Sequence, residues 1–174
     1  AEYLPDWHPW EDYKDSYASI KSLGGGAALT LSHDIDLVKY LSKSQVKKSY
    51  GIKNHINLLG IDVEGAVDII INYKNGITSN SNLSFHQKNK ERFLKILFEK
   101  AQVFINFEAN LMKVYINRTK KITTHKVKNF DRNNLFIDQF RNFINIIESD
   151  DALHLISEDN IKNSEKIIKI CNEA

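Results

Sequence analysis

The sequence predicts an α+β fold, with one open, mostly antiparallel sheet and helices packed on one of its faces. Apolar residues recur at helical spacing near both ends of the chain, whereas apolar and polar residues alternate through its middle. The connections between the alternating segments are too short for parallel crossovers, so antiparallel pairing is expected. With 174 residues, the chain is long enough for one compact domain with a hydrophobic core.

The first 23 residues are aromatic, acidic and poorly periodic, and Pro5 and Pro9 each disfavour helix at the preceding residue. We expect an ordered loop with one helical turn there. Gly24-Gly25-Gly26 then opens a helix that continues to Leu41. Its apolar positions follow helical spacing: Ala28, Leu31, Ile35 and Val38.

Strand character begins at Tyr50. Residues 67–73 alternate, Asn75-Gly76 is a strong two-residue hairpin signal, and residues 77–86 form the return strand. Further strands are expected at 92–98, 103–107, 111–116 and 122–127, which gives a sheet of about five to seven strands.

Two helices are expected to end the chain. Asp131 is a suitable N-cap for the first. This helix has one apolar stripe, formed by Phe136, Phe140, Phe143, Ile144 and Ile147. The apolar positions of the second are Ile161, Ile168 and Cys171, with Ile167 and Ile170 beside them.

Composition disfavours two classes of partner. The net charge of +2 provides no strong field for nucleic acid or an acidic membrane, and no apolar run is long enough to span a bilayer. Cys171 is the one cysteine, which fits a reducing compartment, so a cytoplasmic location is expected. The sequence opens at Ala1 with residues that look like the middle of a protein. We expect that this start reflects either trimming of the sequence or proteolytic maturation.

Common catalytic motifs are missing from the sequence. The run Gly24-Gly25-Gly26 lacks the G-x-G-x-x-G spacing of a dinucleotide-binding turn, and no clear strand precedes it. Neither a Walker motif, a zinc-ligand spacing nor a G-x-S-x-G turn is present. We therefore assign no metal ligands and no cofactor-binding residues to this chain.

The most specific pattern spans the first 41 residues. It includes residues 2–13 (EYLPDWHPWEDY), Ser16-Tyr17, 23–26 (LGGG) and 32–36 (SHDID). This pattern resembles the start of the C-terminal domain in the Gfo/Idh/MocA family (glucose–fructose oxidoreductase, inositol dehydrogenase and rhizopine catabolism). The later order is similar in pattern, with Asp62-Val63-Glu64 before the hairpin and Phe85-His86-Gln87 at a strand end.

The resemblance implies a two-part enzyme. Family members have an N-terminal Rossmann domain that binds NAD or NADP, and a C-terminal domain like those of dihydrodipicolinate reductase and glyceraldehyde-3-phosphate dehydrogenase. Residues 1–174 would then be the C-terminal substrate-binding and oligomerisation domain, with the Rossmann domain absent from this chain and acting as its partner. The resemblance implies an oxidoreductase acting on a sugar or sugar derivative, and we expect the isolated chain to be inactive.

The resemblance also suggests a catalytic residue, His33, as the acid/base that exchanges a proton with the substrate hydroxyl. The family pattern has an aspartate after the glycines where this chain has Thr30, which carries no charge. Thr30 is expected to line the substrate, and Asp36 to position His33. The alternatives are an ordinary helix histidine for His33, a surface carboxylate for Asp36 and a filler role for Thr30.

Three further residues are expected to contact substrate. His8 and Tyr13 belong to the aromatic N-terminal segment, whose alternative role is a small satellite core. His86, at a strand end, could reach substrate or simply be exposed. Homo-oligomers are expected to assemble through the sheet, where Leu94, Ile96, Phe104, Met112 and Val114 offer apolar area. The alternative function is a non-catalytic binding or oligomerisation module of the same fold.

Overall fold

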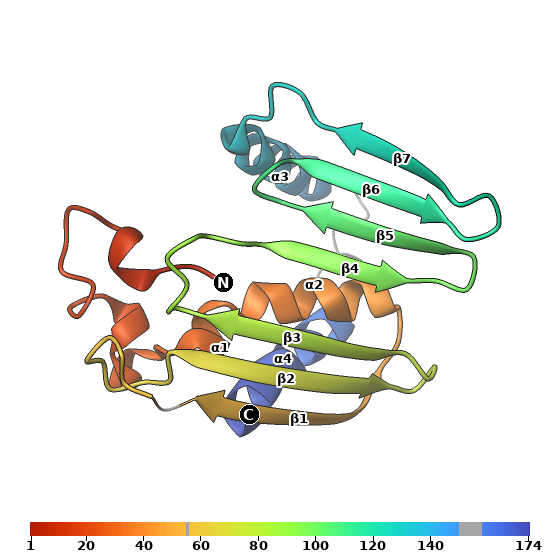
Figure 1. Cartoon of the computed structure of the whole chain (residues 1–174). Coiled ribbons are helices and arrows are strands. Elements are labelled where there is room, and N and C mark those ends of the chain that lie inside the picture. Colours follow the sequence, from red (N-terminus) through yellow and green to blue (C-terminus); the bar gives the residue numbers. More distant parts are fainter. Residues whose placement is uncertain (55, 150–157) are drawn as a thin grey trace. The chain divides into compact units, whose positions relative to one another are not determined.

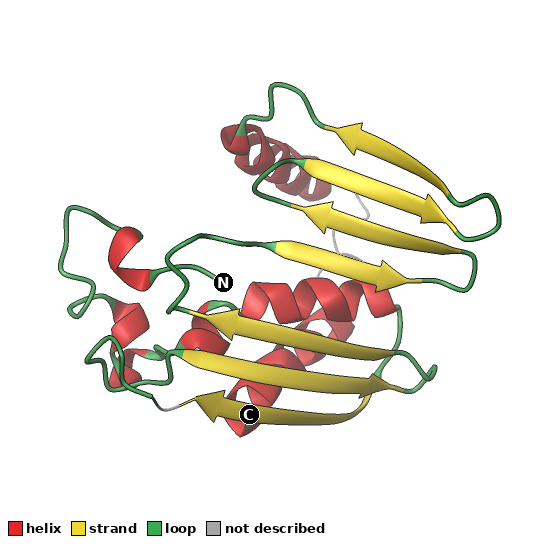
Figure 2. Ribbon diagram, viewed as in Figure 1, coloured by secondary structure: helices red, strands yellow, loops and turns green. Residues whose placement is uncertain are grey.

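The computed structural model describes residues 1–54, 56–149 and 158–174 (Figures 1 and 2). These residues fall into two compact units. The first comprises Ala1–Asn89 and Glu158–Ala174, and the second comprises Lys90–Ser157. The first unit contains every residue to which the sequence assigned a site role.

The N-terminal segment contains short 3₁₀ turns at Leu4–Asp6, Tyr17–Ser19 and Lys21–Leu23, where one turn was expected. Residues 2–4 lie along the end of strand β3 (Thr78–Ser84). The Glu2 N–H donates to Ser84 O at 2.8 Å, and the Leu4 N–H donates to Phe85 O at 3.1 Å. These bonds attach the segment to the core, where the side chain of Leu4 is buried.

The expected helix after the glycines is broken into α1 (Ala27–Thr30) and α2 (Ser32–Ser42). The break is at Leu31, which has φ −99° and ψ 17°, in the sparsely populated bridge region. The prediction of a continuous helix was therefore wrong. Ala27 and Ala28 of α1 and Ile35 of α2 are all fully buried on either side of the break.

The first unit has a three-stranded antiparallel sheet in the order β1-β2-β3. Its strands are β1 (Val46–Asn54), β2 (Ala66–Tyr73) and β3 (Thr78–Ser84). One face is apolar and buried, and it presents Val67, Ile69, Ile71, Tyr73 and Leu83. Strand β1 starts earlier than the sequence indicated, because this lysine-rich edge strand lacks a clear alternation of apolar side chains.

Helix α4 (Glu158–Glu173) completes the core of the first unit. It contacts α1, α2 and β1, so the helices of this unit cover one face of its sheet (Figure 1). The buried side chains of α4 are Ile167, Ile170 and Cys171, whereas Ile168 is exposed. The expected core positions were therefore right for Cys171 and wrong for Ile168. The side chain of Ile161 lies outside the described residues.

The second unit has a four-stranded antiparallel sheet in the order β4-β5-β6-β7. The strands are β4 (Phe93–Leu97), β5 (Ala101–Asn106), β6 (Leu111–Ile116) and β7 (Lys121–Lys126). Helix α3 (Arg132–Glu148) follows, and Asp131 accepts the Asn133 N–H at 2.9 Å, which confirms the predicted N-cap. The expected single sheet is thus two separately hydrogen-bonded sheets, although the α+β class and the antiparallel order are confirmed.

Candidate functional site

The glycine run makes a close backbone contact at the entry to α1. Gly26 has φ +107°, and a Cβ there would lie 2.5 Å from Glu64 Oε1 and 2.6 Å from Oε2. A Cβ on Gly25 would lie 2.6 Å from the carbonyl oxygens of Tyr17 and Ala18. The glycines therefore allow the tight helix entry expected from the sequence.

Glu64 holds the start of α1. Its backbone carbonyl accepts the Ala27 N–H at 3.1 Å, and its Oε1 accepts the Ala28 N–H at 3.1 Å. Gly26, the N-cap residue, has no side chain to cap these groups. The buried Glu64 carboxylate replaces that cap with a charge-assisted hydrogen bond.

Glu64 is the structural residue that the sequence analysis did not single out. Its role depends on a contact between positions 28 and 64, which no local pattern reveals. A carboxylate directly before Gly65 and the alternating strand 67–73 was the available signal. Glu64 also disfavours cofactor binding at the glycine run, because its negatively charged carboxylate would repel the pyrophosphate of a dinucleotide there. The run Gly24-Gly25-Gly26 therefore does not suit the pyrophosphate of a dinucleotide.

His33 is the second residue of α2. It follows the break at Leu31, which separates it from α1 and from the glycine corner (Gly24-Gly25-Gly26, at the entry to α1). Its side chain is 55% exposed, and its Nε2 lies 3.6 Å from Asp34 Oδ2. The carboxylate beside the imidazole is thus Asp34. The side chain of Asp36 is exposed farther along α2, so its positioning role stays a prediction.

Thr30 and His86 each carry a buried polar atom without a hydrogen-bond partner among the described residues: Thr30 Oγ1 and His86 Nε2. A buried polar group in this state costs stability, which makes such groups candidates for ligand contact. Thr30 ends α1, whereas His86 follows β3 and pairs with Tyr3. The imidazole of His86 packs directly over Gly65.

His8 and Tyr13 make contacts within their own segment and to a nearby loop. The Tyr13 hydroxyl donates to Leu59 O at 2.8 Å. His8 Nδ1 lies 2.6 Å from Glu11 Oε1, and its ring stacks on Trp10 at 5.1 Å between centroids. These contacts fit the satellite-core alternative for Tyr13, which packs against the core, whereas His8 is 40% exposed and stacks on an exposed Trp10. The substrate role of both residues stays a prediction.

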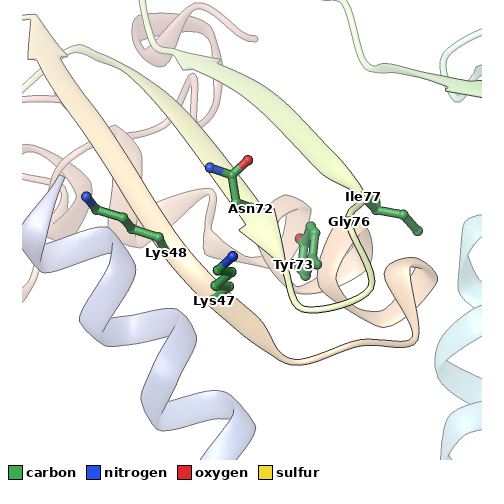
Figure 3. Close-up of a pocket in the computed structure, with 6 residues that line it drawn as sticks. All are labelled: Lys47, Lys48, Asn72, Tyr73, Gly76 and Ile77. Carbon is green, nitrogen blue, oxygen red and sulfur yellow. The ribbon is translucent and has the colours of Figure 1, made fainter.

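A pocket of about 360 Å³ lies in the first unit, at the end of the sheet where β2 turns into β3. Figure 3 shows its lining, which consists of Lys47, Lys48, Asn72, Tyr73, Gly76 and Ile77. None of the six residues with predicted site roles lines this pocket. The predicted residues are distributed over the N-terminal segment, α1, α2 and the end of β3, and none of the hydrogen bonds or ion pairs of the described residues joins Thr30, His33 and His86 to one another.

Comparison with proteins of known structure shows which fold this chain resembles. No family profile and no curated protein matches the sequence. A putative oxidoreductase from Thermotoga maritima superposes with a TM-score of 0.69 at 12% identity, over 99% of this chain and 50% of that one. Levoglucosan dehydrogenase, solved with NADH and levoglucosan, gives a TM-score of 0.58 at 21% identity, over 72% and 38%.

The chain has the fold of part of these oxidoreductases. Structures of the Gfo/Idh/MocA type are among those it resembles, which confirms the fold implied by the sequence resemblance. A super-repressor mutant of Gal80p from Saccharomyces cerevisiae is also similar, with a TM-score of 0.61 at 14% identity, over 75% of this chain and 38% of that one. The chain thus spans 38% to 50% of the length of these three proteins.

Proposed function

We propose that this chain is the substrate-side and assembly domain of a Gfo/Idh/MocA oxidoreductase that uses NAD or NADP and acts on a sugar or sugar derivative. The observation that carries the proposal is His33, an exposed imidazole at the start of α2, directly after the glycine corner. The fold likeness to levoglucosan dehydrogenase supports the chemical class.

In this proposal His33 performs acid/base chemistry. Its imidazole accepts the proton of a substrate hydroxyl while the carbinol carbon is oxidised to a carbonyl, and it returns the proton in the reverse direction. Bound NAD(P) would supply the acceptor for the hydride. The carboxylate nearest to the imidazole is that of Asp34, whose Oδ2 lies 3.6 Å from Nε2.

The remaining predicted residues would hold the substrate. Thr30 Oγ1 and His86 Nε2 are buried without partners, so a sugar hydroxyl could satisfy each of them. Asp36, His8 and Tyr13 are proposed as secondary contacts. Because the glycine corner does not suit a pyrophosphate, the cofactor would be bound mainly by an N-terminal Rossmann domain, and the isolated chain would be inactive.

Assembly into homo-oligomers is proposed through the sheets. On the face of the first sheet opposite the helices of its own unit, Tyr50 and Ile52 of β1 and Ile70 of β2 are 50%, 75% and 43% exposed. Tyr50 and Ile70 are register partners, so these side chains form one apolar cluster on that face. A cytoplasmic location stays a prediction; within the described ranges, no helix has the length and apolarity needed to cross a bilayer.

A second candidate is a non-catalytic binding or oligomerisation module. Thr30 favours it, because a buried hydroxyl cannot supply the negative charge of the aspartate in the family pattern. The likeness to Gal80p, a protein whose mutant is described as a super-repressor, adds support from the fold.

The test joins this chain to its dinucleotide-binding domain and compares His33→Ala with His125→Ala, which removes an exposed histidine of β7 in the second unit. For the enzyme, His33→Ala lowers kcat by about 10²- to 10⁴-fold with cofactor affinity retained. His125→Ala leaves kcat unchanged. Equal turnover in both variants would remove His33 from the mechanism, and no turnover in the wild type with any sugar would favour the non-catalytic module.

A further inference from the structure

The pocket at the β2–β3 end of the first sheet presents hydrogen-bond donors. Two of its six lining residues are lysines, Lys47 and Lys48, and a third is an asparagine, Asn72. The apolar wall is formed by Ile77 and the ring of Tyr73, whose hydroxyl is occupied by Ser79 Oγ at 3.4 Å. This combination of two cations, an amide and an apolar wall suits an anion attached to a larger organic group.

A strand irregularity explains why two consecutive lysines line the same pocket. Val46 pairs with Tyr73 and Lys48 pairs with Asn72, so Lys47 is an extra residue without a partner in the register. Such a bulge interrupts the strict alternation of side chains across the sheet. Figure 3 shows Lys47 on the side of β1 that faces Asn72, whereas the side chain of Lys48 extends away from Asn72 and Tyr73.

The amide of Asn72 is oriented by its neighbour on β3. The Thr78 hydroxyl donates to Asn72 Oδ1 at 2.8 Å, so the carbonyl side of the amide is occupied. The Nδ2 group, which has two N–H donors, is then the part of the amide available to a ligand. In the part of the chain that the structure describes, Nδ2 makes no side-chain hydrogen bond.

The segments that line this pocket, residues 47–48 and 72–77, contain no carboxylates. The sequence has no Asp or Glu between Asp36 and Asp62, and none between Asp68 and Glu91. Lys47 and Lys48 have no ion pair with any described residue; the Lys48 Nζ lies 4.6 Å from the ring centroid of Tyr50. An aromatic face leaves the positive charge of the Lys48 ammonium intact, so Lys48 adds to the positive charge near the pocket, whereas Lys47 is the lysine beside Asn72.

We propose that this pocket binds a phosphate group, either inorganic phosphate or the phosphoryl end of a small organic ester. Multiply charged oxyanions take several donors at once, and lysine binds them as a point charge. The site is separate from the one at His33. Helix α2 rises about 14 Å between His33 and its last residue, Ser42, which precedes the turn into β1.

The test uses calorimetric titration of the whole chain with inorganic pyrophosphate, orthophosphate, glucose 6-phosphate and glucose. We expect saturable binding of the three phosphates and none of glucose. In Lys47→Gln/Lys48→Gln the affinity for pyrophosphate should fall about tenfold or more, because the charge-assisted hydrogen bond of Lys47 and the positive charge of Lys48 are both lost. Tighter binding of glucose 6-phosphate than of orthophosphate would identify the ester as the ligand, and equal binding would identify phosphate itself.

The matched control is Lys95→Gln/Lys113→Gln, which removes the same charge from two exposed positions of β4 and β6. This variant should keep wild-type affinity, and the amide NMR signals of Asn72 and Gly76 should shift on titration of the wild type. The proposal is overturned by absence of saturable pyrophosphate binding, by equal losses in the two double variants, or by signal shifts confined to the second unit. Because His33 is untouched in both variants, these outcomes are independent of the oxidoreductase test.

Discussion

Replacing Gly26 with alanine tests the contact that shapes the predicted site. The backbone at φ +107° is a conformation that only glycine adopts readily, so an alanine there costs about 1–3 kcal/mol in strain. The new Cβ would also overlap Glu64 Oε1, 2.5 Å away, and displace the carboxylate from the Ala28 N–H. Losing that charge-assisted bond costs about 1.5–3 kcal/mol more. The free energy of unfolding should therefore fall by about 2.5–6 kcal/mol.

Gly24→Ala is the matched control two residues earlier. Gly24 also has a positive φ, +79°, but a Cβ there would meet no atom within 4 Å. Its cost should be limited to the left-handed conformation, about 1–2 kcal/mol. Urea unfolding followed by tryptophan fluorescence gives the comparison, because Trp7 and Trp10 both lie in the first unit.

A double-mutant cycle isolates the contact itself. In a Glu64→Ala background, Gly26→Ala should cost no more than the backbone strain, because the overlapping carboxylate is gone. Equal losses for Gly24→Ala and Gly26→Ala, or an unchanged cost of Gly26→Ala in the Glu64→Ala background, would refute the contact as the reason for glycine at this position.

Three other predictions concern stability. Burial raises the pKa of the Cys171 thiol to about 11, with Lys53 lowering it and Glu64 raising it further. The fold thus favours the protonated thiol, so its contribution to stability is fully present below about pH 9 and declines as the pH rises toward 11. Urea titrations at several pH values should show the free energy of unfolding falling over this range, and Cys171→Ala should make that fall smaller. Ile170→Ala should lower the free energy of unfolding by about 2–5 kcal/mol, whereas Ile168→Ala, at a 50% exposed position, should change it by less than about 0.5, and equal losses would contradict the packing of α4. Asp131→Ala should destabilise the start of α3 by about 1 kcal/mol, seen as about fivefold faster hydrogen exchange at its first amides, and unchanged exchange would show that the cap is not stabilising.

Features with a local cause could be predicted from the sequence. Asn75-Gly76 identified the hairpin between β2 and β3, where Gly76 has φ +88°. Asp131 identified the start of α3. The alternation in residues 67–73 identified the buried face of β2, whose side chains Val67, Ile69 and Ile71 are nearly inaccessible to solvent.

Features that depend on contacts between residues distant in sequence could not be predicted from the sequence. The helix break at Leu31 lies between two helices that both pack into one core. No Pro or Gly occurs between residues 27 and 42 to mark this break in the sequence. The cap supplied by Glu64 joins residues separated by 36 positions. Strand β1 is held by pairing with β2 and by Ala174, which packs against Gly51, so its own side chains carry a weak strand signal.

The candidate site was predicted only as a set of residues. The structure brings Thr30 and His33 to adjacent helices and places His86 at the end of β3, but it puts Asp34, not Asp36, beside the imidazole. Helical spacing favoured Asp36, because residues three apart share a face of a continuous helix. The neighbouring carboxylate at Asp34 reaches the imidazole from the first turn of α2, directly after the break.

The most direct measurement is a crystal structure of the protein with its dinucleotide-binding domain, NAD(P) and a sugar substrate. The account predicts that a ring nitrogen of His33 lies within hydrogen-bond reach, about 2.6–3.2 Å, of the hydroxyl on the carbon that faces the nicotinamide. An imidazole directed into solvent while another side chain of the chain contacts that hydroxyl would contradict it.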